Sequence, residues 1–203
     1  MIDSVMDPCF PGGVPSTDAS TRERLLTVAE RLLLESGYDA VSVRAINSAA
    51  GMNPAAVHYH FGSKDALIAA LLEARLAPVW QRRLDEVTER RRGGWTPTVP
   101  ELVDLVVTPL AELAADPVGA LRLRLLARFV LGRREPAWTS RWFGLGPWIE
   151  LLRDARPELA KAEAAQRWLL AFGLVLQFFA DGMPGEVPVE TLRAFVAAGL
   201  AGS

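Results

Sequence analysis

Three side chains with polar-tipped rings follow one another at His58, Tyr59 and His60, directly after a run of small residues. Ring N–H and O–H groups can hydrogen-bond to base edges or phosphates, and small residues let a backbone approach the floor of a groove. Consecutive helical positions are about 100° apart, so the three rings cannot all face a core, although we expect one of them to do so. A metal site is a poor alternative, because positions i and i+2 do not face each other on a helix.

Two short helices joined by a tight turn are expected to carry these rings. A helix capped by Ser42 ends near Gly51, and Asn53-Pro54 then supplies a favoured N-cap and a favoured first helical residue. The second helix should run over residues 54–60. A glycine-containing turn of this length sets two helices at a steep angle, as in a helix-turn-helix. The spacing alone leaves open whether the pair binds DNA or belongs to another small three-helix cluster.

Lys64 follows Ser63, the expected cap of the next helix. A cation is electrostatically unfavourable at a helix N-terminus, because that end already carries partial positive charge. Binding of one phosphate by the ammonium together with the free backbone N–H groups would account for a lysine here. A solvated surface lysine is the alternative.

The rest of the chain is predicted to be helix after helix, with no sustained period-2 alternation that would indicate a sheet. Ser20 and Glu23 fit a capping box, and Gly37 is placed to end the first helix. Residues 1–19 are predicted to be a flexible arm, followed by a head over 20–64 and a body over 65–203. The expected helices cover residues 20–37, 42–51, 54–60, 64–92, 100–115, 117–132, 138–154 with a break near 144–147, 157–181 and 188–201.

Composition excludes several classes of protein. The 203 residues include 22 Lys plus Arg, 24 Asp plus Glu, two His and one Cys, and half of them are hydrophobic. A single cysteine, Cys9, forms no disulfide framework or structural zinc site, and we expect it to be a reduced thiol. The most apolar stretch, residues 169–180, is shorter than the roughly 18 residues of a membrane span. With no visible targeting segment, the sequence predicts a cytoplasmic protein. The excess negative charge lies in residues 1–19, and the head is weakly basic.

Residues 21–70, and especially 42–71, resemble the TetR family of bacterial transcriptional regulators. The resemblance covers about the first third of the chain, and it rests on the combination of Gly37-Tyr38, Ser42-Val43-Arg44, Gly51-Met52, Tyr59-His60-Phe61, Ser63-Lys64 and Leu67. It implies an all-α protein with an N-terminal three-helix DNA-binding head, which contains the helix-turn-helix. A larger helical body for ligand binding and dimerisation would follow.

The resemblance also implies roles for individual positions. Phosphate or groove-edge contacts are implied for Ser42, Arg44, Tyr59, His60 and Lys64, and base reading is implied for Asn53, Ala55, Ala56 and His58. Two positions depart from the common pattern. Asn47 stands where a small alanine is usual, so it either hydrogen-bonds locally or alters the packing under the reading helix. His58 replaces a frequent Tyr or Asn, so the pattern does not say which base it reads.

A homodimer is expected from the resemblance and also from the C-terminal helices. Residues 168–180 are apolar on nearly every face, and such a helix must be covered all round. Burial within one monomer is the alternative to a second copy. Two-fold symmetry would imply a pseudo-palindromic operator read in successive major grooves. The expected interface residues are Trp168, Phe172, Val175, Phe179, Leu192 and Val196.

An unknown small-molecule effector, apolar or aromatic, is expected to bind in the body, and no cofactor or metal is expected. Aromatic walls suit such a ligand, and an inward-facing arginine could pair with an acidic one. Aromatic side chains at helical spacing are equally compatible with a plain core, and arginines with a solvated face. The candidate pocket residues are Trp80, Arg122, Trp138, Trp142 and Trp148.

Taken together, the sequence predicts a ligand-responsive, sequence-specific DNA-binding regulator, a repressor that its effector releases from the operator. One alternative is a helical ligand-binding or scaffolding dimer that has lost DNA binding. An enzyme is disfavoured, because nucleophilic catalysis needs a partnered group of side chains. Both histidines lie in the head, the only cysteine is in the arm, and there is no glycine-rich phosphate loop.

Overall fold

The computed structural model describes residues 17–132, 138–180 and 186–202, and every regular element in these ranges is a helix. The predicted all-α fold is therefore confirmed. In chain order the elements are α1 (Thr17–Ala40), α2 (Val43–Ala49), α3 (Ala56–Phe61), α4 (Lys64–Arg92), α5 (Val99–Ala114), α6 (Pro117–Leu131), the 3-10 helix η1 (Arg141–Phe143), α7 (Gly146–Ala155), α8 (Lys161–Ala180) and α9 (Val189–Ala201).

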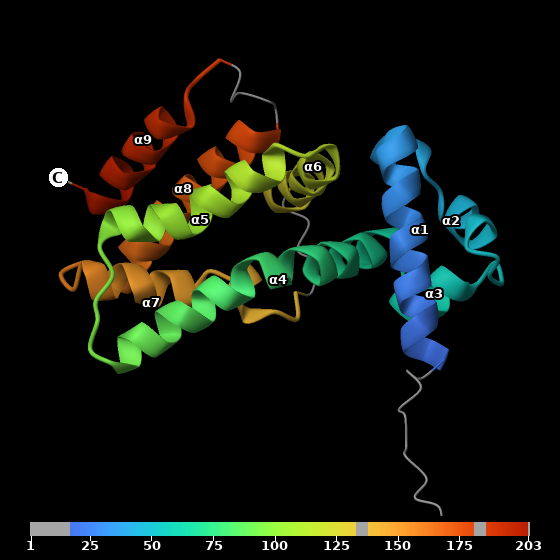
Figure 1. Ribbon diagram of the computed structural model, residues 1–203, viewed down its shortest axis with the longest axis horizontal. Helices are drawn as coiled ribbons and strands as arrows, with labels where there is room; N and C mark the ends of the chain where they lie inside the picture. The colour runs from blue at the N-terminus through green and yellow to red at the C-terminus, as the bar shows by residue number, and fades with distance from the viewer. Residues whose placement is uncertain (1–16, 133–137, 181–185, 203) are drawn as a thin grey trace, which may run out of the picture.

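The helices form two groups that α4 connects (Figure 1). Helices α1, α2 and α3 gather at one end of the molecule, and α5 to α9 form the larger group at the other. Helix α4, with 29 residues, begins beside α3 and runs the length of the larger group. Helix α6 packs on α8 and also contacts α1. Two helices of the body, α4 and α6, therefore touch the N-terminal helices directly.

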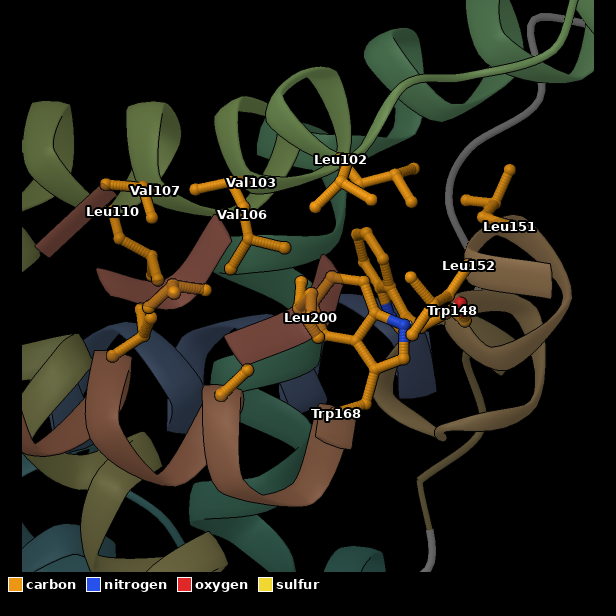
Figure 2. Close-up of a cluster of buried hydrophobic side chains, with 14 of the residues drawn as sticks. Leu102, Val103, Val106, Val107, Leu110, Trp148, Leu151, Leu152, Trp168 and Leu200 are labelled. Atoms are coloured by element: carbon orange, nitrogen blue, oxygen red, sulfur yellow. Dashed lines mark hydrogen bonds between the residues drawn. The ribbon is translucent and has the colours of Figure 1, made fainter. Parts of the chain in front are cut away.

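Two apolar cores follow this division. One cluster joins buried residues of α1 to α4 with one face of α6, including Leu25, Ile46, Leu71 and Phe129. The other joins α5, α7, α8 and α9 with Leu84 and Val87 of α4 and Leu123 of α6. Figure 2 shows its centre, where Trp148 and Trp168 lie against the leucines and valines of α5. The indole Nε1 of Trp168 donates to the carbonyl of Trp148 at 2.7 Å, which satisfies its one buried donor.

Local signals account for most helix starts. Ser42 Oγ accepts from the Ala45 N–H at 3.1 Å, and Ser63 Oγ accepts from the Ala66 N–H at 3.0 Å. Outside the head, α8 begins at Lys161 rather than at residue 157, and the helix expected from residue 138 begins only with η1 and α7. Two starts in the head also differ from the prediction. Helix α1 is already formed at Thr17, so Ser20 lies inside the helix, and residues 17–19 belong to the helix rather than to an arm. The rest of the predicted arm, with Cys9, lies outside the described residues.

The second differing start is that of α3. Asn53 Oδ1 accepts from the Ala55 N–H at 2.8 Å, and this bond closes a turn before the helix proper begins at Ala56. Two predicted interruptions are present. Gly37, with φ at 77°, breaks the regular path of α1, and the expected break near 144–147 separates η1 from α7. No helix within the described ranges is both long and apolar enough to span a membrane.

Candidate nucleic-acid interface

The turn between α2 and α3 contains a glycine in the left-handed region. Gly51 has φ at 63°, a conformation that residues with a side chain rarely adopt. A Cβ at this position would also lie 3.3 Å from Nη2 of Arg24, so the guanidinium of α1 sits directly beside the turn. Arg24 is exposed. Sequence reasoning missed this basic group, because its position beside the turn depends on how α1 crosses α2.

Most of the side chains expected to face DNA are exposed. Tyr59 is 83% exposed, the largest fraction among the exposed large apolar and aromatic side chains of the described chain. On the opposite side of α3, Val57 is fully buried and anchors the helix to the core of the head. Ala56 is the one expected reading residue that is partly buried. The exposed members of the expected set are Ser42, Arg44, Asn53, Ala55, His58 and Tyr59.

His60 occupies a different environment from its two neighbours. Its side chain is 11% exposed, and Nδ1 lies 2.9 Å from Oδ1 of Asp18 in the first turn of α1. Its carbonyl accepts from Arg22, whose guanidinium also lies 4.3 Å from the centre of the Phe61 ring. The implied phosphate contact therefore does not match its placement. Of the three consecutive rings, His60 is the one turned inward, and it fastens the end of α3 to α1.

Lys64 also has partners inside the protein. Its ammonium donates to the carbonyl oxygens of Tyr38 and Val41 and lies 4.0 Å from the centre of the Tyr38 ring. Burial lowers the pKa of this ammonium, although the carboxylates of Asp39 and Asp65 act in the opposite direction. These contacts tie the start of α4 to the segment between α1 and α2. They account for a lysine at a helix N-terminus without a bound phosphate.

Asn47 is the one buried polar residue among the described residues, with 1% of its surface exposed. Its Nδ2 donates to the carbonyl of Pro54 at 2.5 Å, and its Oδ1 accepts from the N–H of Val57 at 3.1 Å. Both contacts reach across from α2 to the start of α3. Of the two roles left open for this residue, the structure shows hydrogen bonding, and it joins two helices.

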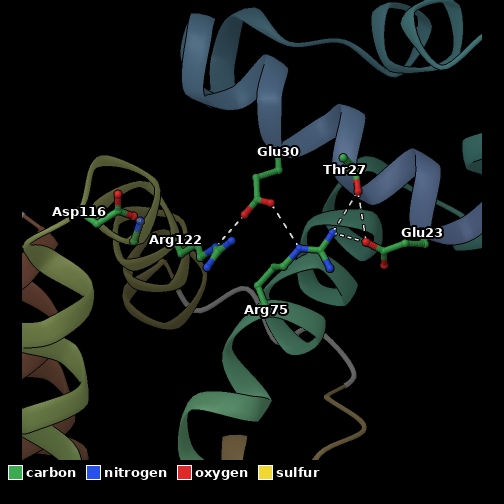
Figure 3. A network of polar contacts seen from close by, with 7 residues as sticks. Glu23, Thr27, Glu30, Arg75, Asp116 and Arg122 are labelled. Carbon is green, nitrogen blue, oxygen red and sulfur yellow. Dashed lines mark hydrogen bonds and ion pairs between the residues drawn. The ribbon is translucent and has the colours of Figure 1, made fainter.

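A polar network connects α1 to α4 and α6 (Figure 3). The carboxylate of Glu30 pairs with Arg122 of α6 at 2.7 Å and with Arg75 of α4 at 3.3 Å. Arg75 also donates to Glu23, and this hydrogen bond lowers the pKa of the Glu23 carboxyl. Arg122 was expected at the ligand pocket. The structure instead places its guanidinium at the contact between head and body.

An apolar cavity of about 270 Å³ lies among α4, α5, α6, α7 and α8. Two of the expected pocket residues, Trp80 and Trp148, line it. Trp138 stacks on Phe143 with ring centres 4.7 Å apart, so it contacts a cavity wall residue. The side chain of Trp142 is not among those that the structure describes. The walls are mostly aliphatic and aromatic, and include Leu110, Leu126, Phe143, Phe172 and Leu176, with Ser140 among the few polar groups.

The expected dimer residues are mostly buried within the single chain. Trp168 is 1% exposed, and the other buried members of that set are Val175, Phe179, Leu192 and Val196. Phe172 lines the apolar cavity. These side chains are already covered, so they cannot form an intermolecular surface without rearrangement. The exposed apolar side chains of the same two helices are Leu169, Leu170 and Phe195.

Known proteins match the N-terminal helices in sequence. A family model described as bacterial regulatory proteins, tetR family, matches residues 25–71. The HTH-type transcriptional repressor Rv1474c of Mycobacterium tuberculosis is 43% identical over 53 residues, which are 26% of this chain and 28% of that protein. The chain thus aligns with only about a quarter of the length of this curated relative.

Solved structures extend the likeness of fold to nearly the whole chain. The fatty acid degradation regulator FadR from Bacillus halodurans has a TM-score of 0.57 and 21% identity, with 90% of this chain and 95% of that chain covered. A TetR transcriptional regulator from Rhodococcus sp. RHA1 has a TM-score of 0.54 and 14% identity, with 92% and 96% covered. The N-terminal segment is therefore similar to helix-turn-helix transcriptional regulators, and the described chain shares the helical fold of these solved structures. Residues 25–71 of the chain are thus similar to the tetR family of bacterial regulatory proteins.

Proposed function

We propose that this protein is a homodimeric transcriptional repressor that binds a pseudo-palindromic operator and leaves it when a small-molecule effector binds in the body. The observation that carries the proposal is that α3 has one side buried in the head and one side exposed. Its inner side is fixed by fully buried Val57, and its outer side presents Tyr59, 83% exposed, together with His58. A tyrosine with so large an exposed fraction gains no stabilisation from the core of its own chain. A nucleic-acid backbone would give its ring and hydroxyl group a partner.

Base reading by α3 would use small side chains and one imidazole. Nδ1 of His58 lies 2.9 Å from the carbonyl oxygen of Gly62, a geometry in which the neutral ring donates from Nδ1 and keeps Nε2 as an acceptor. An acceptor in the major groove fits the amino group of adenine or cytosine. Ala55 offers a methyl group for contact with thymine. Arg24 and Arg44, both exposed, would bind phosphates on either side of the motif.

A second copy of the chain would pack on the outer faces of α8 and α9. Helices α8 and α9 pack on each other and expose the large apolar side chains Leu169, Leu170 and Phe195, which a second copy would cover. A two-fold axis through this surface would place two α3 helices for successive major grooves, which requires half-sites about one helical turn apart. The proposed dimer thus retains the helices expected from the sequence and replaces the buried residues by the exposed ones.

An uncharged, apolar effector is the class that fits the cavity. Its wall is mostly hydrocarbon, and no charged side chain is among its lining residues in the described chain. A larger open groove of about 770 Å³ lies between head and body, but it is lined by several charged groups, among them Arg22, Glu23 and Asp65. The apolar lining favours the smaller cavity for a ligand held by the hydrophobic effect.

Release would follow from a shift of α4 and α6. Trp80 of α4 and Leu126 of α6 line the cavity, and the same two helices carry Arg75 and Arg122, which hold Glu30 of α1. An effector that fits only a displaced arrangement of these helices would favour heads spaced wrongly for two half-sites. We place this activity in the cytoplasm and assign no enzymatic step to it.

Selection of duplexes from a random library by the purified full chain tests the proposal. We expect enrichment of one pseudo-palindrome, bound by the native protein with a marked preference over scrambled duplex. Arg44→Ala should weaken binding, whereas Arg82→Ala, a matched exposed arginine of α4 outside the motif, should not. A native protein that binds every duplex equally would contradict the proposed function. It would favour the helical dimer without specific DNA binding.

A further inference from the structure

We propose that Asn47 is a positioning residue that sets the register of α3 and thereby the base specificity of this regulator. The inference rests on the proposed function, because it concerns how the reading helix is held. It adds a residue that would touch no DNA. The starting observation is that Asn47, with 1% of its surface exposed, is the single buried polar residue of the described chain.

Both the donor and the acceptor of the Asn47 side-chain amide are hydrogen-bonded, one to the turn that precedes α3 and one to the first turn of α3. Oδ1 accepts from the N–H of Val57 at 3.1 Å, and Nδ2 donates to the carbonyl of Pro54 at 2.5 Å. A helix leaves the N–H groups of its first turn without partners inside the helix, and such groups must be satisfied when they are buried. Asn47 satisfies one of them from a neighbouring helix, so it acts as a cap supplied by α2.

Asparagine supplies both the donor and the acceptor that these two contacts need, whereas aspartate and alanine do not. Aspartate offers acceptor oxygens alone when ionised, so its second oxygen would face the Pro54 carbonyl without a proton between them. Alanine offers neither group and would leave the buried N–H of Val57 without its partner. Because one planar amide holds a donor and an acceptor of the same turn, it restrains both the rotation of α3 and its sliding along α2. Apolar packing, such as that of the buried cluster to which Ile46 and Val57 both belong, is not directional and restrains these movements less.

The restrained turn carries the reading face. Ala55 and Ala56 lie between Pro54 and Val57 in sequence, and His58 follows directly. A small rotation of α3 would move each of these side chains relative to base edges, whereas phosphate contacts made by long side chains tolerate such a change. Loss of the two Asn47 hydrogen bonds should therefore reduce discrimination between DNA sequences more than it reduces binding to DNA in general.

The test compares Asn47→Ala and Asn47→Asp with Ile46→Val in the full chain. Ile46→Val removes one buried methyl group from the neighbouring position and leaves both hydrogen bonds of Asn47 in place. Each protein is titrated with the duplex that the native protein enriches and with a scrambled duplex. For both Asn47 variants we expect the ratio of the two affinities to fall about tenfold, with the scrambled affinity nearly unchanged. For Ile46→Val the ratio should stay at the native value even if thermal stability falls.

Amide hydrogen exchange provides a readout that needs no DNA. The Val57 amide should exchange at least about tenfold faster in Asn47→Ala than in the native chain, relative to core amides of α4. A Val57 amide that stays as protected as in the native chain would overturn the proposal. So would specific and scrambled affinities that fall in proportion, as expected for partial unfolding. A native protein that enriches no duplex would contradict the proposed function, and the exchange experiment would still decide whether Asn47 restrains α3.

Discussion

Glu30 of α1 and Arg122 of α6 form an ion pair at 2.7 Å, although 92 residues separate them in sequence. The same carboxylate accepts from Arg75 of α4, so it is shared by one arginine from each of two helices that line the apolar cavity (Figure 3). The Glu30 and Arg122 side chains are only 15% and 20% exposed. A movement of α4 relative to α6 would therefore alter the ion pairs by which Arg75 and Arg122 hold Glu30 of α1.

Removal of Arg122 should weaken this contact. For Arg122→Met we expect the free energy of unfolding to fall by about 0.5–1.5 kcal/mol, because the pair is partly screened and Glu30 keeps Arg75 as a partner. Denaturant unfolding of a double-mutant cycle with Glu30→Gln measures the pair itself. Arg124→Met, on the exposed side of the same helix, is the control. Fully additive effects of the two substitutions would show that the pair contributes nothing.

Tyr59 and His60 are adjacent but should respond in opposite ways to substitution. Tyr59→Ala should leave the unfolding free energy within about 0.5 kcal/mol of native, because the ring is exposed, and should weaken operator binding about tenfold. His60→Ala removes the partner of Asp18 and should lower stability by about 1 kcal/mol, with DNA binding reduced only as far as folding is. Thermal unfolding and fluorescence anisotropy on labelled duplex separate the two effects. Equal behaviour of the variants in both assays would contradict the assignment.

The ammonium of Lys64 is expected to stabilise the fold rather than bind phosphate. Lys64→Met removes its hydrogen bonds to Tyr38 and Val41 and should lower stability by about 1–3 kcal/mol. The dependence of DNA affinity on salt concentration should keep its slope. Arg44→Met, by contrast, should reduce that slope by about one unit. A similar reduction in slope for Lys64→Met would contradict this prediction and would support the phosphate contact that the sequence resemblance implies for Lys64.

The outer face of α8 should control assembly. Leu170 is 76% exposed, and Leu170→Glu should turn the proposed dimer into a monomer without unfolding the chain, because a buried, unpaired carboxylate would oppose the interface. Leu34→Glu, on an exposed apolar position of α1, is the matched control and should remain dimeric. Sedimentation velocity reports the mass of each protein. A Leu170→Glu chain that stays dimeric would place the interface elsewhere.

Acid should weaken the link between α1 and α4 through Glu23. The hydrogen bond from Arg75 holds the pKa of Glu23 below its ordinary value of 4.5, so the folded state favours the ionised form. The resulting stabilisation is present above pH 4.5 and is lost as pH falls through the lowered pKa. Because Glu23 is exposed, we expect the loss to stay below about 1 kcal/mol. Chemical unfolding at a series of pH values should show a shallower acid-side decline for Glu23→Gln, and an identical decline would contradict this origin.

Local chemistry made much of the head predictable. Ser42 and Ser63 cap their helices as expected, and Gly51 lies in the turn that joins α2 to α3. These signals act within a few residues, so they can be read without knowledge of the tertiary structure. Where a partner lies far along the chain, the residue pattern indicates a candidate side chain but not its role. Arg122 on its leucine-rich helix was such a candidate, since nothing near it in sequence indicates Glu30.

From the amino-acid sequence we can predict the helical class, most helix boundaries, the helix-turn-helix and the resemblance to the TetR family. Which side of each helix is buried depends on how the helices pack, and helical periodicity does not show it. Residues 168–180 are apolar on nearly every face, so helical periodicity could not show that Trp168 is buried while Leu170 is exposed. Three consecutive rings in α3 could not all face inward, but only the packing of α1 selected His60. Burial depends on which elements meet, and contacts between residues distant in the chain leave no local signal.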